Sequence, residues 1–553
     1  MKRAKRGKLR DWIELFDVSD NSVSRVLSRI YGEDPAVTEA RRRFYLEALS
    51  AFGRTYGSEA EVIIVRTPAR VNLMGVHVDH RGGYTNYICI AREILMVCQE
   101  REDDRVILHN IDSAFEPSDF RINQELPESK RGNWMKYIER AEITPGHWSN
   151  YIKAAVLRLQ DRFQNRALKG MNIMVSGDIP SSAGLSSSSA LVVASALATV
   201  ELNNLDISRQ ELVELCAQGE WYVGTRGGAG DQAAMLFGRR GYITHMRFLP
   251  FRQEEIEYIP FPKGYKVIIC NSLRQASKSG SERSAYNQTI AAYETVLMLI
   301  KEILTKKRGY SPRFVESRVK HLRDVNEPTL GVRTEQIYEI LKCLPERISR
   351  QELLARLPSY RERLLQIFKT HEEPEEGYKV RQVALFGLAE CQRGEITAQL
   401  LKKGEIEKFG QLMYISHDGD RVVSFDEHGR RKRWDNRVTN EYLDRLINAL
   451  KSPDSEAREG ARLYMQPGGY GCSCEEMDQM VDIARRVPGV IGAGLTGAGL
   501  GGCILVLVSS EKVQEVIDAL ADNYYLPRGL PTAAEVCVLT EGAGVIDSGE
   551  CKR

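Results

Sequence analysis

Four consecutive serines in a loop of small residues give this sequence its first candidate for chemistry. The loop lies within residues 176–190 and contains Gly184 and Ser186–Ser189. The alternating run before it, 171–175, predicts a strand, and the apolar run after it, 191–200, predicts a buried helix. Small side chains let backbone N–H groups approach an anion, and a helix start adds unpaired N–H groups and the positive end of a dipole. We expect a phosphate cradle whose serines cap the helix or bind Mg²⁺. A Ser-rich helix cap is the alternative, since the Walker lysine is absent.

A second group of polar residues precedes a Gly-Gly turn. Within residues 67–84 the chain carries Arg70, Asn72, His77, Asp79, His80 and Arg81. A polyol needs a donor or an acceptor for each hydroxyl, and this density of bonding groups suits such a ligand. The alternative interpretation is a polar surface where a strand enters a turn.

Three further features are weaker indications of a functional site. Glu220 and Asp231 are eleven positions apart around a Gly-rich turn and could flank one metal–substrate site. Residues 492–503 hold six glycines in twelve positions, which brings backbone close to a partner or makes a bulged turn. Trp148 begins a predicted helix, where it could stack on a base or pack in the core.

Composition limits the partners that the chain is expected to have. It has 553 residues, 77 Lys+Arg against 75 Asp+Glu, a net charge of +2, 42% hydrophobic and 27% charged residues. These values are typical of a soluble globular protein and indicate neither a nucleic-acid nor a membrane partner. No apolar run approaches a membrane span, and the basic start is not followed by an apolar segment. The eleven cysteines form no C-x-x-C pair, which predicts free thiols, no zinc site and a cytoplasmic location.

The elements that must position these residues follow from apolar periodicity. Residues 1–58 are expected to form helices on the outside of the main body. Residues 61–65 predict a strand, and 274–409 are mostly helical, with charged, solvated helices within 305–378. Residues 422–434 predict a hairpin whose turn lies at His428–Gly429. Further expected elements are helices at 148–159, 211–217, 478–486 and 511–523 and strands at 242–245, 265–270, 504–508 and 534–539.

Taken together, three ordered stretches resemble the motifs of the GHMP kinases, and of galactokinases in particular. Residues 67–84 resemble the galactokinase signature G-R-V-N-L-I-G-E-H-x-D-Y-x-G-G-Y. Residues 179–190 are similar to the P-x-x-x-G-L-S-S-S-A phosphate loop, and 492–503 to the third motif, G-x-x-x-T-G-x-G-x-G-G-C. The resemblance spans about residues 50–545.

The resemblance implies a mixed α/β, α+β fold with two domains and a helical N-terminal extension. Residues 1–58 would form the extension, 59–260 the N-terminal kinase domain, and 261–553 a ferredoxin-like C-terminal domain. That last domain would contain a helical insertion at about 305–378 and a hairpin insertion at about 418–468. ATP would bind between the domains, and its γ-phosphoryl group would move to the anomeric hydroxyl of a sugar. The oligomeric state is left open.

Roles are implied position by position. Asp231 would accept the C1 hydroxyl proton, and Arg70 would offset charge at the transferring phosphoryl. Ser188 and Glu220 match the Mg²⁺ ligands. The sugar contacts would be His77, Asp79, Val76, Gly228, Arg226, Arg274 and Tyr286. The ATP contacts would be Trp148, Ser182, Ala183, Gly184, Leu185, Ser186, Ser187, Ser188, Ser189, Gly497 and Gly499, with Gly501 also near the reacting centre.

Departures from the galactokinase pattern leave the sugar open. Val76 stands where galactokinases carry Glu, His80 replaces Tyr, and Arg226 replaces Pro. Galacturonokinases resemble the chain more closely at all three points. Arg226 or Arg274 could pair with a C6 carboxylate. Galacturonate is therefore slightly favoured over galactose, and arabinose, which lacks C6, also suits Val76. A sugar- and ATP-binding sensor without catalysis is the alternative from another class.

Overall fold

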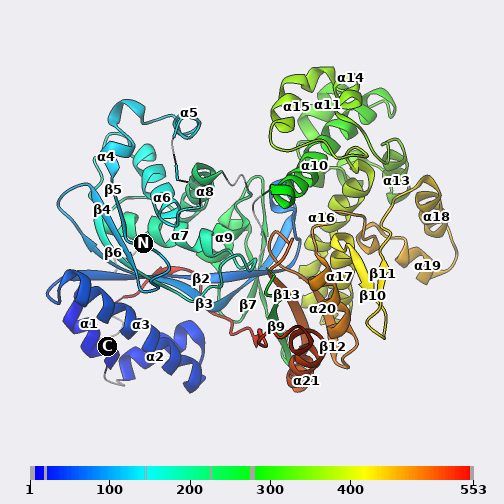
Figure 1. Ribbon diagram of the computed structural model, residues 1–553. Helices are drawn as coiled ribbons and strands as arrows, with labels where there is room; N and C mark the ends of the chain where they lie inside the picture. Colours follow the sequence, from blue (N-terminus) through cyan, green and yellow to red (C-terminus); the bar gives the residue numbers. More distant parts are fainter. Residues whose placement is uncertain are drawn as a thin grey trace.

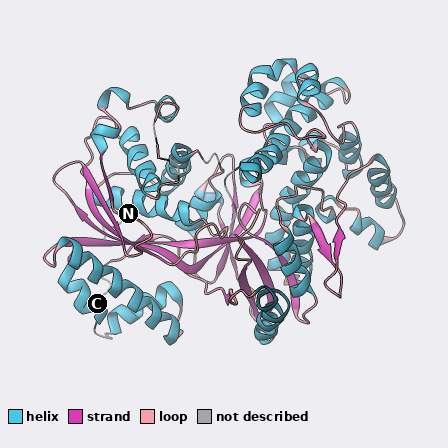
Figure 2. Ribbon diagram, in the orientation of Figure 1, coloured by secondary structure: helices cyan, strands magenta, loops and turns pink. Residues whose placement is uncertain are grey.

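The structure is a computed structural model that describes residues 6–17, 21–141, 143–144, 146–224, 227–274 and 280–547. It is built on a nine-stranded sheet and a four-stranded antiparallel sheet, both flanked by helices (Figures 1 and 2). The predicted mixed α/β class is confirmed. None of the described helices combines the length and the apolar character needed to cross a membrane.

The larger sheet is organised on two long antiparallel strands, β2 (Glu61–Met74) and β3 (Tyr84–Glu100). Its other strands are β1 (Gly7–Lys8), β4 (Arg105–Asn110), β5 (Ser118–Arg121), β6 (Met171–Gly177), β7 (Tyr242–Arg247), β8 (Glu257–Pro260) and β15 (Gly544–Val545). The last of these shows that the chain returns to the first sheet at its C-terminal end, by pairing with β2. The domain boundaries given above stay a prediction.

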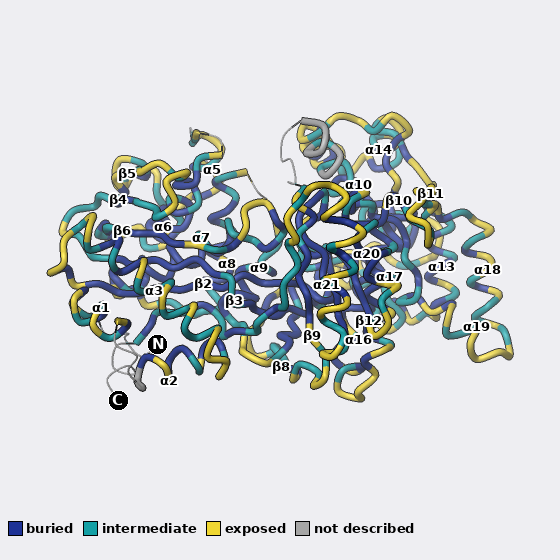
Figure 3. The backbone as a smooth tube through the Cα atoms, turned by 60° about the horizontal axis from the view of Figure 1, so that its bottom comes forward, coloured by how far each residue is buried: buried dark blue, intermediate teal, exposed yellow. Residues whose placement is uncertain are grey.

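The prediction for residues 61–84 was wrong in one respect. The strand does not end at Val65 but continues to Met74, and irregularities in its pairing fall at Pro68/Ala69 and Asn72/Met74. Its partner β3 was not predicted. Both strands are buried on two faces, so neither shows the alternation of polar and apolar residues that marks a half-exposed strand (Figure 3).

Alternate residues of the long strands contact two separate helix layers. Ile63 and Val65 face a core shared with α6 (Ser149–Arg162) and α7 (Ser187–Leu202). Val62 and Ile64 face the N-terminal helices. Those helices are α1 (Leu9–Asp17), α2 (Asn21–Tyr31) and α3 (Pro35–Tyr56). The predicted extension therefore covers part of one face of the sheet, where its helices are seen in blue below the strands in Figure 1.

The smaller sheet has the order β12–β13–β9–β14. Its strands are β9 (Tyr265–Asn271), β12 (Val490–Leu495), β13 (Cys503–Ser509) and β14 (Ala534–Val536). One face packs on α20 (Glu475–Arg485) and α21 (Val513–Leu520), and the other on α17 (Ile406–Asp420). This arrangement agrees with the expected antiparallel α+β layer.

Helices from within residues 280–460 form a helical body that packs beside the two sheets, at the upper right of Figure 1. Its helices are α10 (Gly280–Lys306), α11 (Pro312–Arg318), α12 (Glu327–Leu330), α13 (Thr334–Lys342), α14 (Arg350–Arg356), α15 (Arg361–Phe368), α16 (Val380–Lys402), α18 (Asn440–Leu450) and α19 (Ser455–Gly460). They enclose an apolar cluster of their own, so the charged helices of 305–378 are solvated on one side only. The predicted hairpin is confirmed as β10 (Val423–Phe425) and β11 (Arg431–Arg433).

Four remaining α-helices belong to the first part of the chain, and three of them lie before the glycine turn. These are α4 (Ile122–Glu125), α5 (Trp134–Ile138) and α8 (Arg209–Glu220). The short helix α9 (Gly230–Phe237) follows a glycine turn and contacts both β2 and β3. Its first turn carries Asp231, so the packing of α9 fixes where this carboxylate lies relative to the sheet.

Candidate functional site

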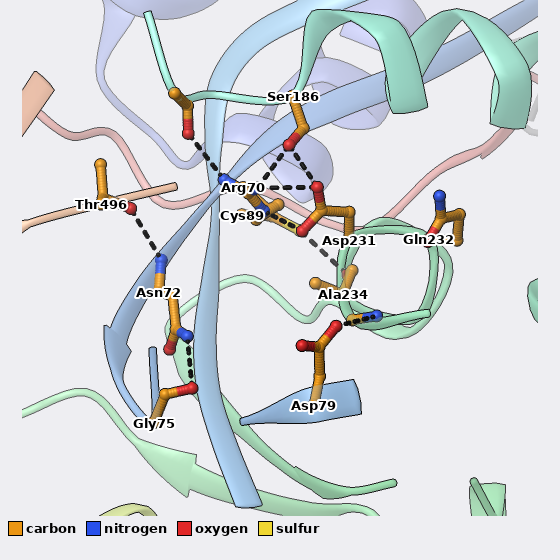
Figure 4. A network of polar contacts seen from close by, with 12 residues as sticks. Arg70, Asn72, Gly75, Asp79, Cys89, Ser186, Asp231, Gln232, Ala234 and Thr496 are labelled. Carbon is orange, nitrogen blue, oxygen red and sulfur yellow. Dashed lines mark hydrogen bonds and ion pairs between the residues drawn. The ribbon is translucent and has the colours of Figure 1, made fainter. Parts of the chain in front are cut away.

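Arg70 joins two of the predicted motifs to the turn that carries Asp231. It lies inside β2, and its Nε and one terminal nitrogen donate to Oδ1 and Oδ2 of Asp231, each at 2.7 Å. The same terminal nitrogen donates to the hydroxyl of Ser186, which in turn donates to Asp231. The other terminal nitrogen donates to the carbonyl of Gly184 at 2.9 Å. Figure 4 shows this network, which assembles residues up to 161 positions apart.

The cation of this pair is buried, and its carboxylate is partly exposed. Arg70 is 5% exposed. Burial alone would lower the pKa of Arg70, but the Asp231 carboxylate outweighs it and raises that pKa above its ordinary value. A bidentate guanidinium–carboxylate pair also fixes orientation, because two parallel hydrogen bonds allow one geometry. Asp231 is thus a rigidly placed carboxylate with a fixed cation beside it.

The serine loop has the backbone expected of an anion cradle. Ser182, Gly184 and Ser186 all adopt positive φ angles, of 57°, 77° and 59°. Helix α7 then begins at Ser187, so Ser187–Ser189 form its first turn, where backbone N–H groups lack partners within the helix. Ala183, Leu185 and Ser189 are buried and anchor the loop. The predicted helix start and loop are confirmed, while phosphate binding stays a prediction.

The third motif lies directly on this loop. The backbone N–H of Cys503 donates to the carbonyl of Ala183 at 3.1 Å, and Thr496 accepts from the N–H of Asn72 at 3.2 Å. A Cβ atom on Gly497 would lie 2.5 Å from the carbonyl oxygen of Gly184, and one on Gly502 2.6 Å from the carbonyl carbon of Ala183. Gly499, also at positive φ, passes against Cys472 instead. Glycine is therefore required because two backbones touch.

Asp79 faces the start of helix α9. Its Oδ2 accepts from the N–H of Gly230 at 3.2 Å, and its Oδ1 lies 3.0 Å from Nδ1 of His80. Burial alone would raise the pKa of Asp79, but the bond to His80, its charge and the Gly230 N–H lower that pKa to about 2. A Cβ on Gly228 would lie 2.0 Å from Oδ2, so the glycine turn makes room for this carboxylate. Asp79 and Gly228, both predicted sugar contacts, are thus brought together, and their binding of a sugar stays a prediction.

His77 points toward the other half of the molecule. It adopts a left-handed backbone (φ 59°), its ring stacks on Tyr470 at 4.5 Å, and its Nε2 lies 3.5 Å from Oδ2 of Asp420. Neither of those two atoms has a hydrogen-bond partner among the described residues, although both are buried. One group that hydrogen-bonds to both atoms would satisfy them. A sugar hydroxyl is such a group, because it can both donate and accept.

Glu390 is a site residue that the sequence reasoning missed. Its Oε1 accepts from the N–H groups of Gly75 at 2.8 Å and Val76 at 3.0 Å, and its Oε2 accepts from Arg393 at 2.6 Å. Both side chains of this ion pair are fully buried. The signal available was a Glu and an Arg three residues apart, with Glu390 directly after the apolar run 383–389. The Val76 side chain itself packs in the apolar cluster of the helical body.

The predicted Mg²⁺ ligands present oxygen atoms of the type that a hard cation takes. Glu220 is 8% exposed and its Oε1 accepts from Nε2 of Gln232 at 2.9 Å. The amide oxygen of Gln232 is buried and has no partner among the described residues. Ser188 lies in the first turn of α7. The described part of the chain contains no group of three or more His, Cys, Asp or Glu that could hold a metal ion, and Mg²⁺ binding by Ser188 and Glu220 stays a prediction.

The remaining predicted contacts are placed less directly. Trp148 packs in the core, with its N–H on the carbonyl of Glu116 at 2.9 Å, so an adenine contact for it stays a prediction. Arg274 forms an ion pair with Glu476 at 2.6 Å. Arg226 lies outside the described residues, and for Tyr286 only its place on α10 is described. Gly501 has a φ of 138°.

Three family models match this chain. Residues 50–100 match the galactokinase galactose-binding signature, 150–239 the GHMP kinases N terminal domain, and 448–526 the GHMP kinases C terminal model. A galactokinase of Dictyostelium discoideum is 25% identical over 500 residues, covering 88% of this chain and 89% of that protein. A galactokinase of Chloroflexus aurantiacus is 26% identical, covering 91% and 97%. The crystal structure of Lactococcus lactis galactokinase complexed with galactose shares the fold, with a TM-score of 0.62, 21% identity and coverage of 90% and 99%.

Proposed function

We propose that this chain, which matches both GHMP kinase domain models and the galactokinase galactose-binding signature, is an ATP-dependent sugar kinase. The reaction would transfer the γ-phosphoryl group of ATP to the anomeric C1 hydroxyl of a galactose-configured sugar. The observation that carries the proposal is the contact of Arg70 with Asp231, Ser186 and Gly184. It puts a carboxylate, a cation and the phosphate loop within one hydrogen-bonded unit.

In the proposed reaction Asp231 receives a proton and Arg70 offsets a negative charge. Asp231 accepts the C1 hydroxyl proton as the hydroxyl oxygen forms its bond to phosphorus and ADP leaves. Arg70 is within reach of negative charge that develops on the transferring phosphoryl. The Ser186 hydroxyl, which donates to Asp231, orients the carboxylate. The protein itself contributes little covalent chemistry, because phosphoryl transfer depends on positioning the reactants and on neutralising charge.

The ATP phosphates would lie over residues 182–189 and the start of α7, beneath the Gly-rich loop. Backbone N–H groups at positive-φ residues and at the helix start offer donors without side chains in the way. Ser188 and Glu220 would hold Mg²⁺, which neutralises phosphate charge when it is bound.

The sugar would lie between Asp79, Asp231 and His77. Asp79 and Asp231 flank the first turn of α9, and the unbridged atoms of His77 and Asp420 offer a hydroxyl site. Among sugars we favour galacturonate over galactose, because Val76 removes the Glu that would repel a C6 carboxylate. The relatives named above are galactokinases, which supports the galactose configuration without separating these two sugars.

A sugar panel tests the proposal. Purified protein with Mg-ATP is assayed for ADP release with galactose, galacturonate, glucuronate, arabinose and N-acetylgalactosamine, and the product is checked by ³¹P NMR for an anomeric phosphate. Turnover with a galactose-configured sugar supports the proposal. Binding of sugar and ATP without turnover would indicate a sensor instead, and phosphate at another hydroxyl would overturn the assigned chemistry.

A further inference from the structure

Arg81, a partly buried residue next to the predicted sugar contacts, presents two buried nitrogen donors without an acceptor among the described residues. It ends the short 3-10 helix Asp79–Arg81. Its Nε and one terminal nitrogen are buried and have no hydrogen-bond partner among the described residues. In the same part of the chain no carboxylate lies within 4.0 Å of its guanidinium. A guanidinium keeps its charge at all relevant pH values, so these donors cannot be silenced by losing a proton.

Aromatic packing holds this side chain in place. The guanidinium carbon lies 4.4 Å from the ring centroid of Tyr293, a fully buried residue of α10. The ring of His80 meets the same tyrosine edge-on at 5.9 Å, and Tyr470, which stacks on His77, lies 5.3 Å from it. Arg81 is thus tied through Tyr293 to the cluster of rings that lines His77. A stacked guanidinium keeps its hydrogen-bonding edge free for a planar anion.

Two acidic groups near this ring cluster, Asp79 and Glu390, already have hydrogen-bond partners. Asp79 accepts from Gly230 and His80, and Glu390 accepts from Arg393 and two backbone N–H groups. Asp420 faces His77. Arg81 therefore forms no ion pair with a described carboxylate, whereas Arg274 is taken by Glu476. A buried N–H donor without a hydrogen bond carries a free-energy cost, and a missing ligand is one explanation for such a donor.

We propose that Arg81 determines specificity by binding a carboxylate at C6 of the sugar substrate. The inference rests on the proposed kinase function and names the substrate class as a hexuronate. A planar carboxylate accepts two parallel N–H bonds from the guanidinium fork, and a neutral hydroxymethyl group cannot. Arg81 thereby takes the part that the sequence suggested for Arg226 or Arg274.

The test compares wild type with Arg81→Met and Arg81→Lys. The first keeps much of the apolar stem and removes the charge, and the second keeps a charge but loses the planar fork. Arg239→Met is the matched control, because Arg239 also stacks on a tyrosine, Tyr242, at 4.4 Å and is surface-exposed. Each protein is assayed for kcat/KM with galacturonate and with galactose. Galacturonate and its neutral methyl ester are also titrated calorimetrically without ATP.

We expect Arg81→Met to lower the galacturonate-to-galactose ratio of kcat/KM by roughly 30-fold or more, the usual cost of removing one partner of a buried charge pair. Arg81→Lys should restore part of it, and Arg239→Met should match wild type. Wild type should bind the free acid more tightly than its methyl ester, and Arg81→Met should erase that difference.

Two results would overturn the assignment of Arg81. One is a ratio that changes by less than about threefold in Arg81→Met while galacturonate remains a substrate. The other is a wild type that phosphorylates galactose but neither binds nor phosphorylates galacturonate. If no sugar is phosphorylated, the kinase proposal fails, and the calorimetric comparison of acid and ester still decides whether Arg81 binds a carboxylate.

Discussion

Arg70 donates from two nitrogens to the two carboxylate oxygens of Asp231, each at 2.7 Å, across 161 residues of chain. Residue 70 lies in β2, one of the two long strands of the larger sheet, and residue 231 in the first turn of α9. The side chains therefore reach each other only because α9 packs on that strand. Several expected outcomes depend on this and related contacts.

Asp231→Asn should lower kcat by roughly 10²–10⁴-fold, the usual contribution of a general base. The amide keeps the shape of the side chain, so sugar binding measured by calorimetry should persist. Arg70 would lose its anionic partner, and a thermal melt of the variant separates misfolding from lost chemistry. A folded variant with kcat near that of wild type would remove Asp231 from the role of base.

Glu220→Gln should raise the Mg²⁺ concentration needed for half-maximal rate, because a hard cation loses an anionic oxygen ligand. The buried hydrogen bond with Gln232 can be kept by an amide oxygen, so the fold should persist. Activity is titrated with Mg²⁺ at fixed ATP. An unchanged Mg²⁺ dependence in an active variant would show that Glu220 does not hold the cation.

Gly497→Ala should separate the Gly-rich loop from the serine loop. The added Cβ would lie 2.5 Å from the carbonyl oxygen of Gly184, in a residue with a φ of 80°. Gly264→Ala is a matched control, with a φ of 82° and no atom within 4 Å of the place that its new methyl group would take. Both variants carry the backbone cost of roughly 1 kcal/mol for a left-handed alanine, but only Gly497→Ala should raise KM for ATP. Equal effects on KM would mean that the loops act independently.

Glu390→Ala should lower the free energy of unfolding by about 3–5 kcal/mol, because it leaves the buried Arg393 charge unpaired. It also frees the N–H groups of Gly75 and Val76, so KM for the sugar should rise. Glu395→Ala, an exposed position of the same helix, is the control. Denaturant unfolding measures the first effect. A loss of less than about 1 kcal/mol would show that the pair is not buried as described.

Stability should fall as the pH drops from 6.5 toward 4, in part because of His245. Burial is the largest cause that lowers the pKa of His245 to about 4, whereas the unfolded residue titrates near 6.5. Below pH 6.5 the unfolded chain therefore binds a proton that the folded chain refuses, and unfolding gains up to roughly 3 kcal/mol. Asn86 donates its amide to two carbonyls, so its oxygen accepts from Nδ1 of His245, which places a proton on Nδ1 of the ring. In His245→Gln this part of the pH dependence should vanish, as measured by denaturant unfolding at pH 7.5 and 4.5. Identical slopes in the two proteins would contradict it.

The sequence by itself predicted the features that depend on neighbouring residues. The run 171–200 specifies a strand, a loop of small residues and a helix, and the structure has β6, a left-handed Ser186 and α7 there. Loop and helix-start chemistry is local, because it depends on side-chain size and on the first unpaired N–H groups. The order of the three motifs likewise predicted the kinase family.

Only the tertiary structure decided which distant residues meet. The strand β3 was missed because a strand buried on both faces lacks the two-residue alternation that identifies strands in sequence. The contact of Glu390 with Gly75 joins residues 315 positions apart, and the stacking of Arg81 on Tyr293 depends on where α10 packs. Such contacts are set by how whole helices bury their apolar faces against the sheet. No local pattern in the chain encodes that packing, because the same amphipathic helix can be buried equally well in several registers.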